Sequence, residues 1–311
     1  MMSGRSGSFR LTDLMIYTEV LEMKWSIVAV GSASLLMSGA SHAIAITAST
    51  DANSLANAIL GSGVAVTSST LNGHTDGVGA VSSGTFTNAS GTYGIGSGVV
   101  LSTGDVNNYN DSTNLFPDNS TDYNGFSTAS QEALLDPITG GAFDHFDVTQ
   151  FDIVFDVDTV TESIFFNVVF GSEEFDEYVS TEFIDAFGIY LNGVNIALFN
   201  GQPVNIDHPN MAFIDGTELD GILDPSNLVG DPVMLFEGAV TPGSTDNTLT
   251  FIIADSGDFV LDSTVFLSGF GSTDPGGGVP GGGVPVPEPS TFGLLGLSFA
   301  VMGLTRKFRR S

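Results

Sequence analysis

An acidic loop between two apolar segments is the part of the sequence best suited to chemistry. The apolar segment 164–170 runs into Gly171-Ser172-Glu173-Glu174-Phe175-Asp176-Glu177, and a second apolar segment, 185–191, begins with Asp185. Two carboxylates about 4 Å apart repel each other by about 1 kcal/mol in water and by about 4 kcal/mol at an effective dielectric constant near 20. Such a group must spread apart, take up protons or bind a cation. Ca²⁺ suits it, because Ca²⁺ takes roughly six to eight oxygen ligands in flexible geometry.

Two further acidic positions extend this candidate site. Asp255, Asp258 and Asp262 lie in a second acidic loop, and Asp105 follows a predicted strand. None of these segments fits an EF-hand loop, so the prediction rests on charge density, and ordinary turn-forming aspartates remain the alternative for the second loop. The predicted calcium ligands are Asp105, Glu173, Glu174, Asp176, Glu177, Asp185, Asp255, Asp258 and Asp262.

The charge distribution supports a cation and excludes polyanionic partners. The formal net charge is −29, and none of the seven Lys and Arg residues lies between Lys24 and Arg306. Nucleic acid is therefore excluded as a partner, since its binding depends on Lys and Arg at phosphates. The chain has no cysteine, so disulfides and thiolate metal sites are excluded as well.

Enzymatic chemistry finds little support in the sequence. Paired carboxylates could serve a polysaccharide hydrolase, but such an enzyme usually stacks its substrate on aromatic residues, and the only Trp, Trp25, lies in a predicted signal peptide. His74, His145 and His208 have no Ser or Cys setting typical of nucleophilic catalysis and are expected at the surface or in turns. We expect no catalytic residues.

Alternating apolar residues predict β-strands. In 151–158 the apolar residues take every second position, as in a half-buried antiparallel strand. Segment 164–170 is apolar on both faces, which predicts a central strand. Asn192-Gly193 separates segments 187–191 and 194–199 and predicts a two-residue hairpin turn. Further strands are expected at 232–240, 249–254 and 264–270.

The fold class follows from the spacing of these strands. Residues 50–60 predict one short helix, capped by Thr50 or Asp51 and buried through Leu55 and Ile59. Segment 104–127 reads as a long polar loop, and loops of this length are usually functional or ordered by metal. Many short strands predict an all-β protein, an antiparallel β-sandwich of jelly-roll type with one N-terminal helix, over residues 46–270.

The two ends carry targeting patterns. Residues 1–45 are predicted to contain an upstream extension and a secretory signal peptide, with Met23-Lys24 as its charged start and Met23 as the expected translation start. Residues 271–286 are a predicted flexible Gly/Pro linker. Residues 287–311 combine Pro287-Glu288-Pro289, an apolar helix short for a membrane span, and a basic end, Arg306, Lys307, Arg309 and Arg310.

This C-terminal combination resembles the PEP-CTERM sorting signal of Gram-negative bacteria. The resemblance implies recognition by a membrane-embedded exosortase, cleavage near the tripeptide or retention in the membrane, and export linked to the exopolysaccharide of the biofilm matrix. We therefore expect an exported protein at the outer surface or in the extracellular matrix.

The body resembles the choice-of-anchor L domain of bacterial surface proteins. The resemblance rests on segments 56–64, 94–105, 170–179 and 185–191, of which the acidic block with the following Asp185-Ala186-Phe187-Gly188 is the most specific. The family implies surface location and no defined activity.

Three functions remain open. The leading prediction is a calcium-stabilised structural or adhesive surface protein that contacts extracellular polysaccharide or other surface proteins. The second is a carbohydrate-binding module, in which Tyr109, Tyr123, Phe126 and Tyr178 would stack on sugars. The third is a polysaccharide hydrolase.

Overall fold

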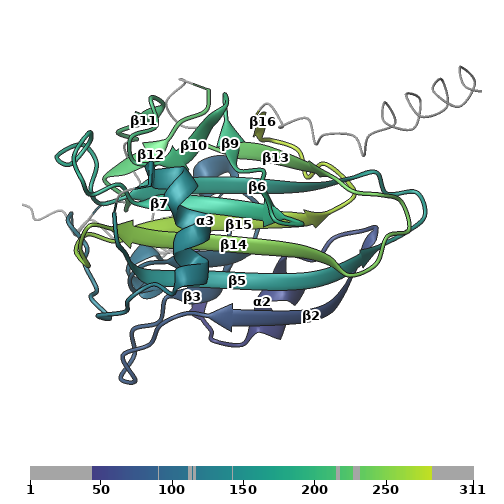
Figure 1. The fold of residues 1–311 in the computed structure, drawn as a ribbon, viewed down its shortest axis with the longest axis horizontal. Helices are drawn as coiled ribbons and strands as arrows, with labels where there is room; N and C mark the ends of the chain where they lie inside the picture. The colour runs from purple at the N-terminus through teal and green to yellow at the C-terminus, as the bar shows by residue number, and fades with distance from the viewer. Residues whose placement is uncertain are drawn as a thin grey trace, which may run out of the picture. The chain divides into compact units, whose positions relative to one another are not determined.

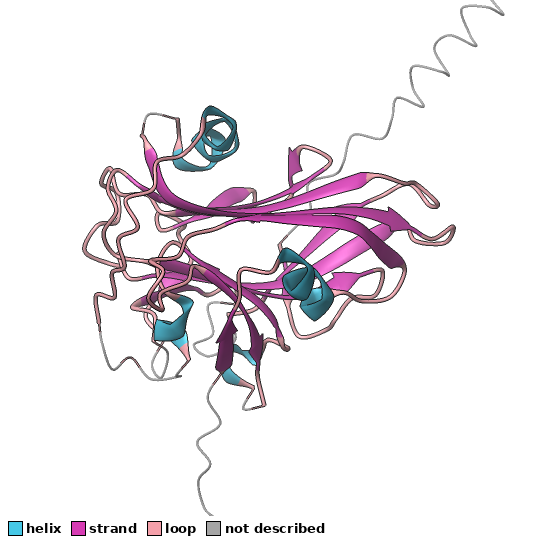
Figure 2. Ribbon diagram, turned by 90° about the horizontal axis from the view of Figure 1, so that it is seen from below, coloured by secondary structure: helices cyan, strands magenta, loops and turns pink. Residues whose placement is uncertain are grey.

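Two β-sheets packed face to face form the body of the protein. The computed structural model describes residues 44–281, except 90, 111–113, 115–116, 142, 215–217 and 227–231. Figure 2 shows the sheets as two layers of strands, and every strand pair is antiparallel except β13 with β16. The predicted antiparallel β-sandwich is confirmed, and its jelly-roll type stays a prediction.

The first sheet has nine strands, with β6 at its centre. Its strands are β1 (Ala45–Ala48), β3 (Ser83–Thr87), β4 (Gly98–Ser102), β15 (Ser263–Gly271), β6 (Ser163–Ser172), β12 (Gly221–Leu223), β11 (Met211–Ala212), β13 (Met234–Ala239) and β16 (Val279–Pro280). Strand β6 pairs with β15 on one side and with β12 and β13 on the other. The central position predicted from its apolar residues is confirmed.

The second sheet has seven strands around β14. Its strands are β2 (Val64–Asn72), β5 (His145–Val157), β14 (Asn247–Ser256), β7 (Ala186–Leu191), β10 (Gln202–Asn205), β9 (Leu198–Phe199) and β8 (Val194–Asn195). Asn192 and Gly193 join β7 to β8 with φ of 49° and 81°, which confirms the predicted hairpin turn.

Aromatic side chains fill the space between the sheets. Phe251 of β14 meets Phe166 of β6 edge to face at a ring-centroid distance of 5.6 Å, and Phe155 of β5 meets Phe270 of β15 at 5.0 Å. Along β5 the residues at 151, 153, 155 and 157 are buried while those between them are half-buried. The alternation read from the sequence therefore marks the core face correctly.

Two α-helices cover the sandwich, and the sequence predicted only one of them. Helix α2 (Ala52–Ile59) begins after Asp51, whose side chain accepts a hydrogen bond from the Asn53 N–H, and buries Leu55 and Ile59 as predicted. Helix α3 (Ala129–Thr139) lies across the seven-stranded sheet (Figure 1) and packs Leu135 and Ile138 against it. The short helices η1 (Thr92–Gly94) and η2 (Val106–Tyr109) complete the described set. The expectation of a single helix was wrong.

The predicted flexible linker is paired with the sandwich over part of its length. Strand β16 runs parallel to β13, with the Val279 N–H donating to the Val233 carbonyl oxygen at 2.8 Å and the Gly281 N–H to that of Leu235 at 2.9 Å. Gly278 permits this approach, because a Cβ there would lie 2.7 Å from Oδ1 of Asn167. The Gly-rich composition thus serves close packing at residues 278–281.

Both targeting ends lie outside the described residues. The signal peptide, the start at Met23, the C-terminal apolar helix and the sorting signal fall there. Between residues 44 and 281, the described helices include none with the length and apolar character needed to span a bilayer.

Candidate metal site

Three carboxylates lie side by side at the end of the nine-stranded sheet. Ser172, the last residue of β6, pairs with Gly221 of β12 and with Ser263 of β15. One residue further along this antiparallel register, Glu173 lies between Asp220 and Asp262. The Glu173 N–H donates to the Asp262 carbonyl oxygen at 3.0 Å, which continues the ladder. We call Asp220, Glu173 and Asp262 the Glu173 row.

A second set of carboxylates lies at the end of the seven-stranded sheet. Ala254 of β14 pairs with Ala186 of β7, so Asp255 and Asp185 are neighbours one residue further. A β-bulge in the pairing of β14 with β5 brings Asp147 into the same neighbourhood, where its charge acts on Asp255. We call Asp185, Asp255 and Asp147 the Asp185 row.

The two rows meet between the sheets. The Ser263 hydroxyl, next to Asp262, donates to Oδ2 of Asp185 at 2.7 Å. Glu174 follows the Glu173 row in the chain, but the charges of Asp185 and Asp258 of the other side act on its carboxyl group. The strand ends of both sheets therefore converge on one acidic region.

Six carboxyl groups of this region are buried: Asp147, Glu173, Glu174, Asp185, Asp255 and Asp262. Glu173 has an exposed fraction of 0%, and neither of its carboxylate oxygens accepts a hydrogen bond in the described part of the chain. One buried carboxylate oxygen each of Glu174, Asp255 and Asp262 also accepts no hydrogen bond in the described part of the chain. All Lys and Arg residues lie outside the described residues, and among the six carboxyl groups only Asp147 has a histidine, His74, whose charge lowers its pKa.

Burial and mutual repulsion raise the pKa values of these groups. Burial, followed by the charge of Asp220, raises the pKa of Glu173 to about 9. Burial, followed by the charge of Asp185, raises the pKa of Glu174 to about 11. Burial also raises the pKa of Asp185 to about 8 and that of Asp262 to about 7. The free carboxylate form of the region is therefore unfavourable at neutral pH without a counter-charge.

The donor set suits a hard divalent cation. Carboxylate and amide oxygens are the ligands that Ca²⁺ prefers, and buried carboxylate oxygens without hydrogen-bond donors are costly unless a cation satisfies them. The unpartnered oxygens of Glu173 and Asp262 could hold such an ion, while the neighbouring Asp220 already accepts the Asn114 side-chain amide and the Asp118 N–H. Glu174, Asp185 and Asp255 form an equivalent set.

Residues 121–125 of the segment 104–127 bind this region through their backbone N–H groups. The Thr121 N–H donates to Oδ1 of Asp262 at 2.8 Å, and the Tyr123 and Gly125 N–H groups donate to the two oxygens of Asp147 at 2.8 and 2.6 Å. Where the loop begins, a Cβ on Gly104 would lie 1.8 Å from Oδ2 of Asp262. The loop and the carboxylates thus order each other.

The structure separates the nine predicted ligands into three groups. Five of them, Glu173, Glu174, Asp185, Asp255 and Asp262, belong to the buried region. Asp258 is half-buried and near Glu174, and Asp105 is half-buried and bound to the N–H groups of Val81 and Asn107. Asp176 and Glu177 are exposed on the turn after β6 and lie outside both rows. The metal role of all nine stays a prediction.

The sequence reasoning missed Asp147 and Asp220. Asp147 lies within β5, in the same two-residue period as the buried positions 149, 151 and 153, and this position could have indicated an inward side chain. Asp220 precedes β12, which has only three residues and therefore gives no periodic signal.

A second cluster of titratable groups is already satisfied by the protein. Glu132 and Asp136 of α3 lie near His145 of β5. The Nδ1 atom of His145 lies 2.6 Å from Oε2 of Glu132, and its Nε2 lies 3.1 Å from the Thr139 hydroxyl. Both ring nitrogens are therefore engaged. His145 is buried in β5, so its expected surface or turn placement was wrong. His208 is buried as well but lies in a turn, where its N–H donates to the Asn205 carbonyl oxygen at 3.1 Å.

The aromatic residues proposed for sugar stacking differ in exposure. Tyr109 is buried, and Tyr123 stacks on His74 at a centroid distance of 5.3 Å. Tyr178 is partly exposed, and Phe126 is 76% exposed beside Phe259. Of the four, only Phe126 and Tyr178 present substantial surface.

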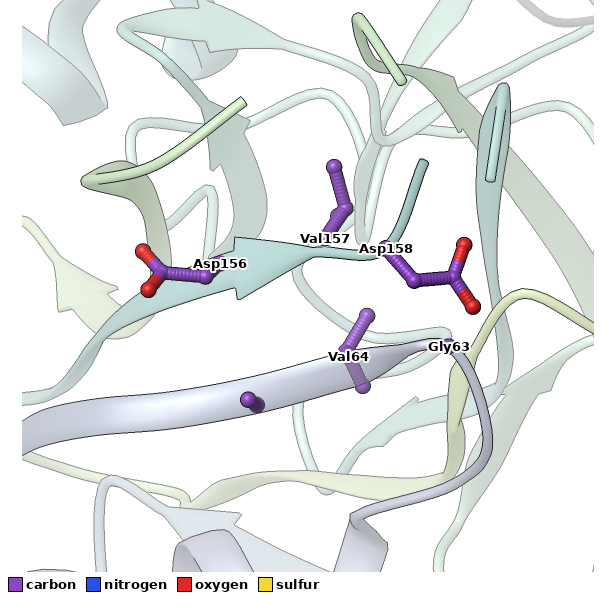
Figure 3. A pocket seen from close by; sticks show the side chains of 6 residues that line it. Gly63, Val64, Asp156, Val157 and Asp158 are labelled. Carbon is purple, nitrogen blue, oxygen red and sulfur yellow. The ribbon is translucent and has the colours of Figure 1, made fainter. Parts of the chain in front are cut away.

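A pocket at the other end of β5 lacks the features of the acidic region. It has a volume of about 370 Å³ and is lined by Gly63, Val64, Ala65, Asp156, Val157 and Asp158. Figure 3 shows the carboxylates of Asp156 and Asp158 pointing away from each other. Asp156 accepts the Asp246 N–H, and Asp158 accepts the N–H groups of Val160 and Thr161. These aspartates stabilise turns.

Comparison with known proteins places the chain among exported, surface-sorted proteins. The family model of the PEP-CTERM protein-sorting motif matches residues 285–310. The family model of the Choice-of-anchor L domain matches residues 44–273, more than half of the chain, and the chain belongs to this family. Both resemblances predicted from the sequence are confirmed. No curated protein and no solved structure matches the chain.

Proposed function

We propose that the protein is a structural or adhesive component of the surface or extracellular matrix of a Gram-negative bacterium, with a β-sandwich stabilised by Ca²⁺. The observation that carries the calcium role is the set of six buried carboxyl groups with no Lys or Arg among the described residues. A bound divalent cation supplies the missing charge and the missing ligands of the unpartnered oxygens.

The sorting signal supports the surface role. The matched motif contains Pro287-Glu288-Pro289 and the basic residues Arg306, Lys307, Arg309 and Arg310. In this proposal the basic end stays on the cytoplasmic side, the apolar segment between holds the chain in the membrane, and an exosortase processes it near the tripeptide. The sandwich is then released to, or retained at, the cell surface.

The burial of the carboxylates favours a structural role over catalysis. A general acid or base must come within hydrogen-bond reach of the substrate proton that it transfers. Glu173 and Asp255 are at most 1% exposed, so a polysaccharide chain cannot reach them in this conformation. The acidic region fits a site that stabilises strand ends better than an active site.

Thermal unfolding of the full chain, with Ca²⁺ and with a chelator, tests the proposal. A ligand at about a hundred times its dissociation constant adds about 2.7 kcal/mol to the free energy of unfolding, so Ca²⁺ should raise the melting temperature clearly. Equal melting in both buffers would refute the calcium role. Mg²⁺ is the matched control, because its strict octahedral geometry suits these flexible ligands less well.

Carbohydrate binding is a second candidate function, favoured by the exposure of Phe126. Its ring lies 5.5 Å from those of both Phe146 and Phe259, which form a rigid base for a stacking platform. A glycan array with the wild type and Phe126→Ala tests this role. Equal binding of both proteins, or no binding by either, would count against it.

A further inference from the structure

We infer that the acidic region holds two separate divalent cations, one in the Glu173 row and one between Glu174 and the Asp185 row. This inference rests on the proposed calcium role and adds the number and positions of the ions. It is carried by the strand register, the distribution of unpartnered oxygens and the balance of buried charge.

The strand register separates the ligands into two sets. Glu173 continues β6 between the ends of β12 and β15, so its side chain shares the neighbourhood of Asp220 and Asp262. Glu174 lies in the turn that follows β6, where its carbonyl oxygen accepts the Tyr178 N–H at 3.1 Å. The charges of Asp185 and Asp258 act on its carboxyl group. Two consecutive glutamates thus serve two different groups of ligands.

The unpartnered oxygens fall evenly into the same two sets. In the Glu173 row, Glu173 and Asp262 have unpartnered oxygens. In the second set, Glu174 and Asp255 have them. The two remaining buried carboxylates are already satisfied by protein donors. Asp147 accepts the Tyr123 and Gly125 N–H groups.

Asp185 is the second satisfied carboxylate. Its Oδ1 accepts the Ser256 N–H at 3.2 Å, and its Oδ2 accepts the Ser263 hydroxyl at 2.7 Å. Each set therefore contains two buried carboxylates with oxygens that no protein donor satisfies and one acidic neighbour, Asp220 or Asp185, that already accepts hydrogen bonds.

The charge balance also favours more than one ion once cation binding has deprotonated the carboxyl groups. Six buried carboxylates carry a formal charge of −6, and one divalent cation offsets two of these charges. Two cations offset the four charges of Glu173, Asp262, Glu174 and Asp255. The charges of Asp147 and Asp185 are stabilised by their hydrogen bonds, because carboxylates bound to N–H and O–H donors are favoured in the ionised form. A single ion would leave two buried carboxylates with unsatisfied oxygens.

Counting the bound ions tests the inference directly. The full chain, purified in detergent and equilibrated with Ca²⁺, is analysed by native mass spectrometry and by elemental analysis. We expect about two Ca²⁺ per chain for the wild type. The double variant Glu173→Gln/Asp220→Asn and the single variant Asp255→Asn should each retain about one. Asp176→Asn/Glu177→Gln is the matched control, because both residues are exposed on the adjacent turn, and it should retain both ions.

A luminescence measurement distinguishes the two positions without changing a carboxylate. Tyr109 is buried next to Glu173 and Asp262, so it should sensitise the emission of Tb³⁺ bound in the Glu173 row. Tyr109→Phe should remove part of the tyrosine-sensitised emission while the number of bound Tb³⁺ ions stays the same.

The outcomes separate this inference from the proposed function. One ion per chain, lost completely in either carboxylate variant, would overturn the two-site inference and leave the calcium role intact. No bound ion would overturn both. Loss of one ion in each variant, with two in the control, supports two sites.

Discussion

Glu173 and Asp262 are neighbours at the ends of β6 and β15, where the Glu173 N–H donates to the Asp262 carbonyl oxygen at 3.0 Å while both side chains keep unpartnered carboxylate oxygens. The backbone ladder thus holds two negative groups together in the interior. Strand pairing supplies the proximity, and a cation is needed to make that proximity favourable.

The substitution Glu173→Gln should have opposite effects with and without calcium. In chelator Gln is neutral without taking up a proton, whereas Glu173 must either repel Asp220 and Asp262 or be protonated, so the free energy of unfolding should rise by on the order of 1 kcal/mol. In Ca²⁺ it removes a ligand, so the stabilisation by Ca²⁺ should shrink. Chemical unfolding of wild type and variant in both buffers measures this. Destabilisation of equal size in both buffers would instead indicate a packing defect.

The metal-free protein should become less stable as the pH rises, in contrast to ordinary acid denaturation. A carboxyl group whose pKa is higher in the folded state binds its proton more tightly there, so stability is lost as pH rises from the unfolded pKa through the folded pKa. For Glu173 this window runs from the ordinary value of 4.5 to about 9. For Asp262 it runs from 3.8 to about 7.

Unfolding in chelator at pH 5 and pH 8 checks the sign of this effect. Stability should be higher at pH 5 than at pH 8. Burial lowers the pKa of His208, so this group alone would make stability rise with pH, but the raised pKa values of the carboxyl groups outweigh it. Ca²⁺ should remove or reverse the difference, because cation binding requires deprotonated ligands. A metal-free protein that is more stable at pH 8 would contradict the electrostatic description of the acidic region.

Gly104 should be essential for the position of Asp262. A Cβ at residue 104 would lie 1.8 Å from Oδ2 of Asp262, so Gly104→Ala must displace this carboxylate and weaken Ca²⁺ binding. Gly96→Ala is the control, because the nearest atom to its Cβ would be the Ser268 hydroxyl oxygen at 3.6 Å, an ordinary contact. Calorimetric titration should show that Gly104→Ala binds Ca²⁺ at least tenfold more weakly than the wild type, a loss of about 1.4 kcal/mol of binding free energy. Gly96→Ala should bind Ca²⁺ as the wild type does. Equal affinities would show that Asp262 is not a ligand.

The sequence predicted those parts of the fold that depend on local periodicity. Strands β5, β6 and β7 and the turn at Asn192-Gly193 were predicted because alternation and turn chemistry are local signals. Helix α3 was missed because polar residues and Pro137 obscure its apolar stripe. Its remaining signal is the capping box of Thr128 and Gln131.

The candidate site shows the same limit. Glu173, Glu174 and Asp185 stood out because they are close in the sequence. Their pairing with Asp220 and Asp255 depends on the register of strands that are distant in the sequence, and single-sequence patterns contain no such information. Asp176 and Glu177 were included for their charge alone, and their exposure separates them from the buried group.

Replacing Pro287-Glu288-Pro289 with three alanines tests the sorting role. The change leaves the described sandwich untouched, since the described residues end at 281, so folding and Ca²⁺ binding should be unchanged. The variant should accumulate in the membrane fraction with its C-terminal peptide intact, because the proposed exosortase no longer recognises it. Cell fractionation and mass spectrometry of the C-terminal peptide measure this, with Asp274→Asn outside the motif as the control. Surface delivery of the alanine variant equal to that of the wild type would show that the tripeptide does not direct sorting.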